Sequence, residues 1–318
     1  MATETDRPVW AAAANEIISA YEERRPLRVA AHRLTEWPFA IDHLVTEGQF
    51  DAVKNATRHI LSAHPNHLYS KTVLAVLQHL PPQSGQLPFS DDLTKDVQVI
   101  PRAGADTAIL LFCDRNNRLA MSLAANHRWF GLLPASLIYL RDFKLFLSLR
   151  GVPSLGATRD ATLASLRNIL ASLGASRILC VGNSAGGFPA LHYGIELGAE
   201  AVLAFATPTS LVRSFNAGCT WIVLANHIAK NVPEFSELDL RTLYVQVERA
   251  PRVRLVYGAN NQNDRLHAEH MEELPSVTSQ KLEGYGGHNV MIELITRGRF
   301  PPLLEWLIGK RSSPISRT

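Results

Sequence analysis

The stretch RILCVGNSAGG, residues 177–187, joins a short apolar run to a turn rich in glycine. The residues after it, up to Leu197, have the apolar spacing of a helix. A strand, a sharp turn and a helix in that order place the serine of a G-x-S-x-G motif above the edge of a sheet. Gly182 and Gly186 leave free the space that side chains two residues from Ser184 would occupy. The N-terminus of the new helix favours a developing negative charge beneath the hydroxyl. The segment therefore predicts that Ser184 is a nucleophile, and a turn with a capping serine is the alternative.

Short apolar runs alternate with helical segments around this motif. The runs cover residues 107–113, 136–140, 177–182, 201–205 and 253–257. Several are apolar at consecutive positions, which is typical of strands buried on both faces of a parallel sheet. The helical segments cover residues 158–173, 185–197, 266–274 and 290–296. This alternation predicts an α/β domain with a mostly parallel sheet flanked by helices. Residues 220–228 also favour a helix, and residues 240–249 fit a helix or a strand.

The N-terminal part of the chain has a different pattern. Apolar spacings of three and four predict helices over residues 10–21, 30–45, 50–61 and 68–80, and these segments are separated by proline and glycine. We expect an all-helical subdomain over residues 1–80, a linker over 81–92, and an α/β domain over 93–310. A lid is expected over 214–240 and a flexible tail over 311–318. Residues 47–79 are weakly similar to one tetratricopeptide-type helix pair, and one unit is too few for a solenoid.

From these motifs the sequence resembles the α/β-hydrolase fold family over residues 93–310. In that family the catalytic serine, acid and histidine follow one another along the chain. The resemblance implies that Asp264, the only carboxylate in the loop after the run at 253–257, is the acid. It implies that His288, which follows a glycine pair, is the base. Asp264 as the N-cap of the next helix is the alternative.

The family stabilises an oxyanion with two backbone amides. The resemblance implies that Ala185, the residue after the nucleophile, supplies one of them. The second would come from the loop over residues 113–118, where this sequence lacks the family's His-Gly pair. Asp114 and Arg115 are both candidates by position. Asn116, together with Asn183 before the nucleophile, is a candidate for substrate binding, and a merely solvated loop is the alternative.

The sequence lacks the motifs that would indicate a metal site, a cofactor, a nucleic-acid partner or a membrane span. Asp264, His267 and His270 share a helical face, but no H-E-x-x-H pattern accompanies them, so we expect no metal site. The glycines at 182–187 match neither a phosphate-binding nor a dinucleotide-binding motif, and we expect no cofactor. Among 318 residues, 46% are hydrophobic and 19% charged, and the net charge of +3 does not indicate a nucleic-acid partner. No apolar run reaches the roughly 20 residues that a membrane span needs.

The sequence therefore predicts a serine hydrolase that cleaves a small-molecule carboxylic ester or thioester through an acyl-enzyme. Three cysteines without a CxxC pair, and a start without a signal-peptide pattern, lead us to expect a cytoplasmic protein. An acyltransferase with an alcohol or amine acceptor would use the same residues, so the sequence leaves it open. A third reading is an inactive interaction protein on a hydrolase fold. The N-terminal helices could join a homodimer or a protein partner.

Overall fold

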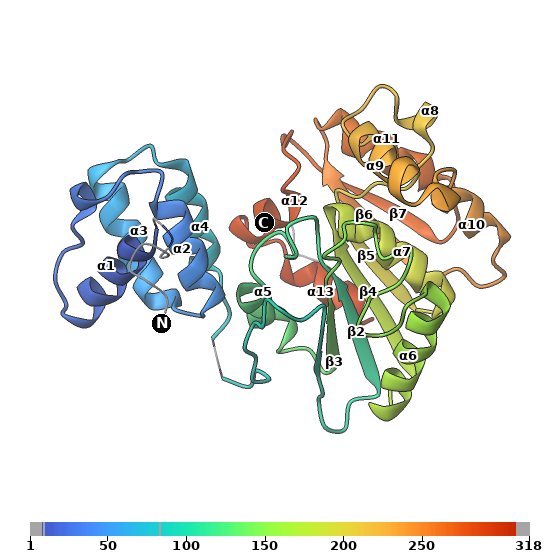
Figure 1. Cartoon of the computed structure of the whole chain (residues 1–318), viewed down its shortest axis with the longest axis horizontal. Coiled ribbons are helices and arrows are strands. Elements are labelled where there is room, and N and C mark those ends of the chain that lie inside the picture. The colour runs from blue at the N-terminus through green and yellow to red at the C-terminus, as the bar shows by residue number, and fades with distance from the viewer. Residues whose placement is uncertain (1–7, 9, 83, 310–318) are drawn as a thin grey trace, which may run out of the picture. The chain divides into compact units, whose positions relative to one another are not determined.

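The computed structural model describes Pro8, residues 10–82 and residues 84–309 (Figure 1). The expected tail, residues 311–318, lies outside the described residues. The chain divides into two compact units. One comprises the chain up to Asp91 together with Met121–Phe130, and the other comprises Asp92–Ala120 together with the chain from Gly131. Within the described residues, no helix combines the length and the apolar character needed to cross a bilayer.

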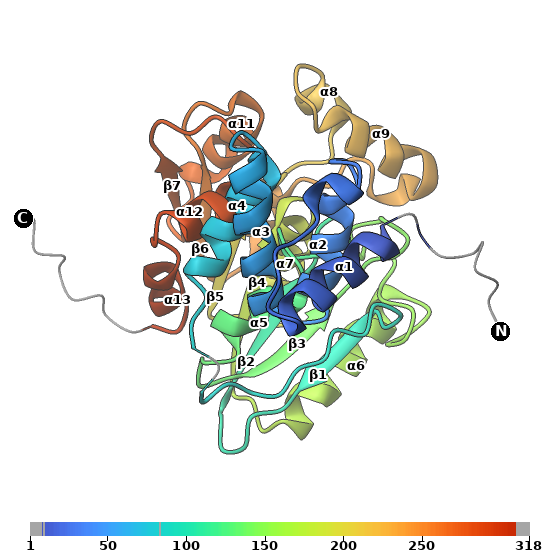
Figure 2. The same ribbon diagram turned by 90° about the vertical axis from the view of Figure 1, so that its left-hand side faces the viewer.

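The first unit is helical, and Figure 2 shows its helices grouped together. Its helices are α1 (Ala11–Glu22), α2 (Trp37–Thr46), α3 (Phe50–Ala63), α4 (Leu68–Gln78) and α5 (Leu123–Phe130). The helix expected from residue 30 begins instead at Trp37, because Pro38 suits the first turn of a helix, where an amide hydrogen has no helical partner. Residues 29–31 form a short 3₁₀ turn. Trp37, Ile41 and Ile60 are fully buried in the unit's core.

The second unit contains one sheet of seven strands in the described part of the chain. The strands are β1 (Val97–Ile100), β2 (Thr107–Phe112), β3 (Ser136–Leu140), β4 (Arg177–Asn183), β5 (Ala201–Phe205), β6 (Arg252–Gly258) and β7 (Val277–Leu282). Their order is β1-β3-β2-β4-β5-β6-β7, and only β1 runs antiparallel to its neighbour. Every residue of β2, β3 and β5 is buried, which explains the continuous apolar runs in the sequence.

Helices cover both faces of this sheet (Figure 1). They are α6 (Arg159–Ser172), α7 (Gly187–Glu196), α8 (Arg213–Asn216), α9 (Ile222–Asn231), α10 (Leu240–Gln246), α11 (Gln262–Glu272), α12 (Val290–Thr296) and α13 (Pro301–Leu307). Val202 and Ala204 of β5 point to the face that shares a core with α6, α7 and α11. Phe205 points to the other face, where its ring lies 6.0 Å from that of Phe300 before α13.

The parallel register brings three loops to one edge of the sheet. Phe112 at the end of β2 lies beside Gly182 of β4, so the loops that follow these two strands are neighbours. β5 and β6 continue the parallel pairing, and the loop after β6 therefore ends at the same edge. This arrangement places the start of the loop 113–118, Ser184 and the start of α11 side by side.

The turn between β4 and α7 depends on close backbone contacts. Ser184 has a φ of 54°, an uncommon conformation for a residue with a side chain. A Cβ on Gly182 would overlap the Gly186 carbonyl oxygen. A Cβ on Gly186 would overlap the carbonyl oxygens of Phe112 and Cys113 at the end of β2. Only glycine fits at these two positions without moving backbone.

Replacing Gly186 by alanine tests this constraint. We expect Gly186→Ala to lower the free energy of unfolding by about 1–3 kcal/mol, because the new methyl group must displace the end of β2. Urea denaturation followed by circular dichroism measures the change. Gly218→Ala is the control, because nothing lies within 4 Å of its Cβ position, and it should change stability by less than about 0.5 kcal/mol. Equal effects of the two variants would contradict the proposed role of the close contact.

Candidate active site

Three side chains from separate segments meet at the carboxyl edge of the sheet. His288 Nε2 lies 2.8 Å from Ser184 Oγ. The Nδ1 atom of the same ring lies 2.9 and 3.1 Å from the two carboxylate oxygens of Asp264. An ionised carboxylate only accepts, so Nδ1 carries the proton of that bond and Nε2 is left to accept from the serine hydroxyl. The structure thus brings together the three residues that the sequence predicts as nucleophile, base and acid.

Asp264 lies in the first turn of α11 and is not the cap of that helix. The cap is Asn261, whose side chain accepts from the amides of Asn263 (3.1 Å) and Asp264 (3.2 Å). The Asp264 carboxylate is therefore available to His288. Its side chain is 1% exposed, whereas that of His288 is 40% exposed. A buried acid beside a solvent-accessible imidazole suits proton exchange at the Nε2 side of the ring.

Trp221, immediately before α9, packs against the imidazole of His288. The two rings meet edge to face with centroids 5.6 Å apart. The loop that carries His288 is held against the end of β6 by a hydrogen bond from the Asn260 amide to the Tyr285 carbonyl, at 3.0 Å. The sequence analysis did not single out Trp221 or Asn261. An asparagine immediately before a helix is a capping signal. The sequence predicted this helix only from residue 266, whereas α11 begins at Gln262, so Asn261 did not stand next to the predicted helix.

Asp114 organises the loop after β2 with its side chain. Its carboxylate accepts from the amides of Asn116 (2.8 Å), Ala120 (3.1 Å) and Arg118 (3.4 Å). It also accepts from the Asn183 side-chain amide at 3.3 Å, and Asn183 directly precedes the serine. One buried carboxylate therefore ties the loop to the end of β4. Burial of this charge is offset by its several hydrogen bonds.

The two candidates for the second oxyanion donor differ in the structure. The backbone amide of Asp114 already donates to the Arg118 carbonyl at 2.6 Å. Across the described residues, the amide of Arg115 has no such acceptor. Arg115 rather than Asp114 is therefore left with a backbone donor near Ala185, which lines the same pocket. Asn183, expected to contact substrate, directs its amide nitrogen to Asp114, and its buried Oδ1 has no hydrogen-bond partner in the described part of the chain.

A wide polar cleft of about 830 Å³ surrounds Ser184 and His288. Its wall is rich in asparagine side chains, namely Asn116, Asn183, Asn261, Asn263 and Asn289. Trp221 and Thr220 close one side, and the Thr220 amide donates to the Asn263 side chain at 2.9 Å. Groups that both donate and accept hydrogen bonds suit a polar portion of a substrate.

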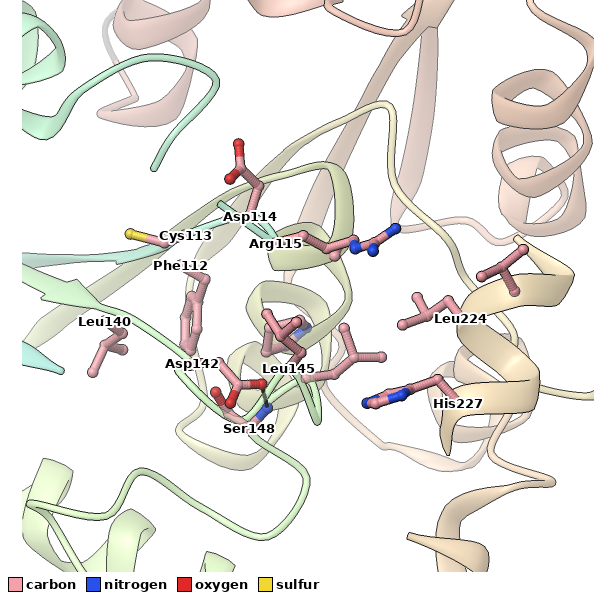
Figure 3. Close-up of a pocket in the computed structure, with 14 residues that line it drawn as sticks. Phe112, Cys113, Asp114, Arg115, Leu140, Asp142, Leu145, Ser148, Leu224 and His227 are labelled. Carbon is pink, nitrogen blue, oxygen red and sulfur yellow. Dashed lines mark hydrogen bonds between the residues drawn. The ribbon is translucent and has the colours of Figure 1, made fainter. Parts of the chain in front are cut away.

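A second and smaller cavity of about 110 Å³ adjoins the cleft (Figure 3). The two share Asp114, Arg115 and Leu145 as lining residues. The smaller pocket is mostly apolar, with Ala185 in its wall, and Figure 3 shows side chains of α9 reaching into it from one side. Ser184 therefore stands where an apolar pocket and a polar cleft meet.

The helical face that carries His267 and His270 serves to position α11. His267 accepts from the Thr209 amide at 2.9 Å through Nδ1, and its Nε2 lies 3.1 Å from Asn216 Oδ1. His270 pairs with Asp239 at 2.9 Å. These bonds attach α11 to the segment after β5. Among the described residues, no group of three or more histidine, cysteine, aspartate or glutamate side chains is arranged as metal ligands.

Comparison with known proteins establishes the fold. No protein-family model and no curated protein sequence matches the chain. The chain is similar to the solved structure of esterase B from Lactobacillus rhamnosis (HN001), with 12% sequence identity and a TM-score of 0.52, over 81% of this chain and 95% of the esterase. A C6-C4 SN3 inhibited form of esterase B from the same organism gives 11% identity and a TM-score of 0.51, over 80% and 96% of the two chains. Together with the sheet order and the flanking helices, this likeness shows that the chain has the α/β-hydrolase fold.

The buried histidine on α11 makes stability depend on pH. Burial lowers the pKa of His267 from 6.5 to about 3. As the pH falls through 6.5, the unfolded chain gains a proton at this residue and the folded chain does not, so stability is lost between about pH 6.5 and pH 3. We expect His267→Gln to reduce the slope of unfolding free energy against pH by about 1 kcal/mol per pH unit between roughly pH 6 and 5.

Chemical denaturation at several pH values measures that slope. His79→Gln is the control, because His79 is exposed on the protein surface and should leave the slope unchanged. His192 is also buried with its pKa lowered to about 3, so the remaining slope of the His267→Gln protein should stay positive. An unchanged slope in His267→Gln would show that this imidazole accepts a proton in the folded protein.

Proposed function

We propose that this protein is a serine hydrolase that cleaves carboxylic esters or thioesters. The observation that carries the proposal is the hydrogen-bonded series from Ser184 through His288 to Asp264, at 2.8 and 2.9 Å. The serine sits on a strained turn between a strand and the N-terminus of a ten-residue helix. Strain at such a position and a base within hydrogen-bond distance are the features of an activated nucleophile.

The proposed reaction proceeds through an acyl-enzyme. His288 Nε2 takes the Ser184 proton while Oγ attacks the substrate carbonyl, and Asp264 stabilises the imidazolium that forms. The Ala185 and Arg115 amides hold the oxyanion. When the carbon–oxygen or carbon–sulfur bond to the leaving group breaks, His288 returns the proton to that group. Water then attacks the acyl-enzyme with His288 as base, which releases the acid and restores Ser184.

Two features favour ester hydrolysis over the alternatives. The solved structures with the same fold that were compared above are named as esterases, which supports ester chemistry. The His288 side chain is 40% exposed and the cleft around it is large, so water can reach an acyl-enzyme. An acyltransferase would need to exclude that water. An inactive interaction protein would not need the serine, histidine and aspartate to be joined by hydrogen bonds.

The nucleophile is tested by labelling. A fluorophosphonate probe should form one adduct, mapped by peptide mass spectrometry to Ser184 and missing in Ser184→Ala. Hydrolysis of short-chain 4-nitrophenyl esters should fall to background in that variant, by about a millionfold in kcat. Asp264→Asn should lower kcat about ten-thousandfold, because an amide at this position favours the wrong imidazole tautomer. A folded protein that shows neither adduct nor turnover would refute the proposal.

Ser122→Ala is a matched control for that experiment, because Ser122 is buried but lies outside the cleft and the pocket. It should label and turn over substrate like the unmodified protein. Adding an alcohol or amine acceptor and measuring the product ratio then separates hydrolysis from acyl transfer. Free acid as the main product supports the proposal, and transfer that dominates at low acceptor concentration would assign the alternative.

The role of Asp114 in holding the loop over residues 113–118 generates a separate prediction. Asp114→Ala removes the acceptor for three backbone amides, so the Arg115 amide should lose its fixed position. We expect kcat to fall about a hundredfold while KM changes by less than about threefold, because the lost contact acts mainly in the transition state. Steady-state kinetics measures both constants. Arg118→Ala, which removes a neighbouring side chain but no acceptor for these amides, is the control, and a rise in KM alone would contradict this role.

A further inference from the structure

Both polar and apolar residues line the small pocket beside Ala185 (Figure 3). Phe112, Leu140, Leu147 and Leu224 form apolar walls. Its volume of about 110 Å³ is below the roughly 150 Å³ of an apolar cavity that accepts benzene, so it fits an acyl chain of about four or five heavy atoms. Polar residues also line this space, among them Asp142 and His227. An apolar acyl chain alone gives no reason for either of them.

His227 presents a buried donor without a partner. Its Nδ1 lies 3.3 Å from the side-chain nitrogen of Asn231, which is a donor. Nδ1 must therefore accept, and in the neutral ring the proton sits on Nε2. Nε2 is buried and has no hydrogen-bond partner among the described residues. Figure 3 shows the ring projecting from α9 into the pocket. A donor left unpaired in such a place indicates a missing acceptor.

Asp142 supplies an acceptor in the same pocket. Its carboxylate accepts from the amides of Ser148 at 2.9 Å and Lys144 at 3.2 Å, which holds it in place. The backbone amides of Phe146 and Leu145 also hydrogen-bond to this carboxylate. The loop around it is strained, because Leu145, Leu147 and Ser148 all have positive φ. Asp142 and His227 line the same pocket of about 110 Å³, so a group bound there has both side chains in its surroundings.

We infer that the pocket takes a short acyl chain with a hydroxyl group near its far end, which accepts from His227 Nε2 and donates to Asp142. A hydroxyl is the simple group that does both. A methyl group would leave the His227 donor unpaired. A ketone or carboxylate could not donate to Asp142. An ammonium could not accept from His227.

This inference rests on the proposed ester hydrolysis, and a substrate series tests it. The series consists of 4-nitrophenyl esters of butanoate, 3-hydroxybutanoate, 3-oxobutanoate, 3-aminobutanoate and octanoate. We expect kcat/KM for 3-hydroxybutanoate to exceed that for butanoate by about tenfold or more, because only the hydroxyl group of 3-hydroxybutanoate can hydrogen-bond to His227 and Asp142. Octanoate should be the poorest substrate, since its chain exceeds the pocket.

A matched pair of variants tests whether His227 causes the preference for 3-hydroxybutanoate. His227→Leu should bring the ratio of the 3-hydroxybutanoate and butanoate rates close to one, because the donor is lost. Asn226→Leu makes a similar change at the neighbouring exposed position of α9 and should keep the ratio of the unmodified protein. Circular dichroism confirms that both variants fold. The ratio in the unmodified protein is informative by itself, whether or not His227→Leu folds.

The outcomes distinguish the preference for a hydroxyacyl group from ester hydrolysis itself. Labelling of Ser184 with equal rates for butanoate and 3-hydroxybutanoate would overturn the hydroxyacyl assignment and leave ester hydrolysis in place. Faster turnover of 3-oxobutanoate or 3-aminobutanoate would overturn it in favour of a group that engages only one of the two side chains. Absence of both labelling and turnover would remove the proposed function and this inference with it.

Discussion

The contact between the backbone of the β4–α7 turn and the end of β2 is the constraint on which the site depends. Gly186 lies against the carbonyl groups of Phe112 and Cys113, and Gly182 lies against Gly186 itself. This contact fixes three things at once: the left-handed conformation of Ser184, the start of α7, and the distance from the serine to the loop after β2. A side chain at either glycine would separate the nucleophile from that loop, and no surface interaction could restore the geometry.

Two carboxylates, one buried and one half-buried, extend this rigidity from the turn to the walls of the site. Asp114 follows β2 and Asp142 follows β3, and each accepts amide hydrogens from the loop that comes after it. The amide hydrogen bonds offset the cost of burying a charge and hold each loop in one conformation. Burial raises the pKa of the Asp142 carboxyl group, while the same amides act in the opposite direction. The loops that line the pocket are therefore held by side chains of their own first residues.

The segment around α9 lines both the polar cleft and the small pocket. Trp221 contacts His288 in the cleft, whereas Leu224 and His227 face the small pocket. Thr220 is attached to α11 through Asn263, and α11 also carries Asp264. The same short helix thus adjoins the proposed base, the proposed acyl pocket and the helix of the proposed acid. Its position links the selection of substrate to the geometry of the reacting groups.

The sequence by itself determined the α/β architecture and the sharp turn that carries Ser184, the proposed nucleophile, because both are encoded in short-range patterns. Continuous apolar runs specify strands buried on two faces, and glycines two residues either side of Ser184 specify a sharp turn. It did not reveal β1 and β7, since both are only partly buried and lack a continuous apolar run. Nor did it reveal the grouping of Met121–Phe130 with the N-terminal helices, which is a long-range contact. Only the tertiary structure decided that Asn261 caps α11, that the Asp114 amide is occupied, and that Asp142 and His227 share one pocket. The first two facts depend on the detailed geometry of a loop, which apolar periodicity does not specify. The third depends on residues far apart in the chain, and local periodicity carries no information about such a pairing.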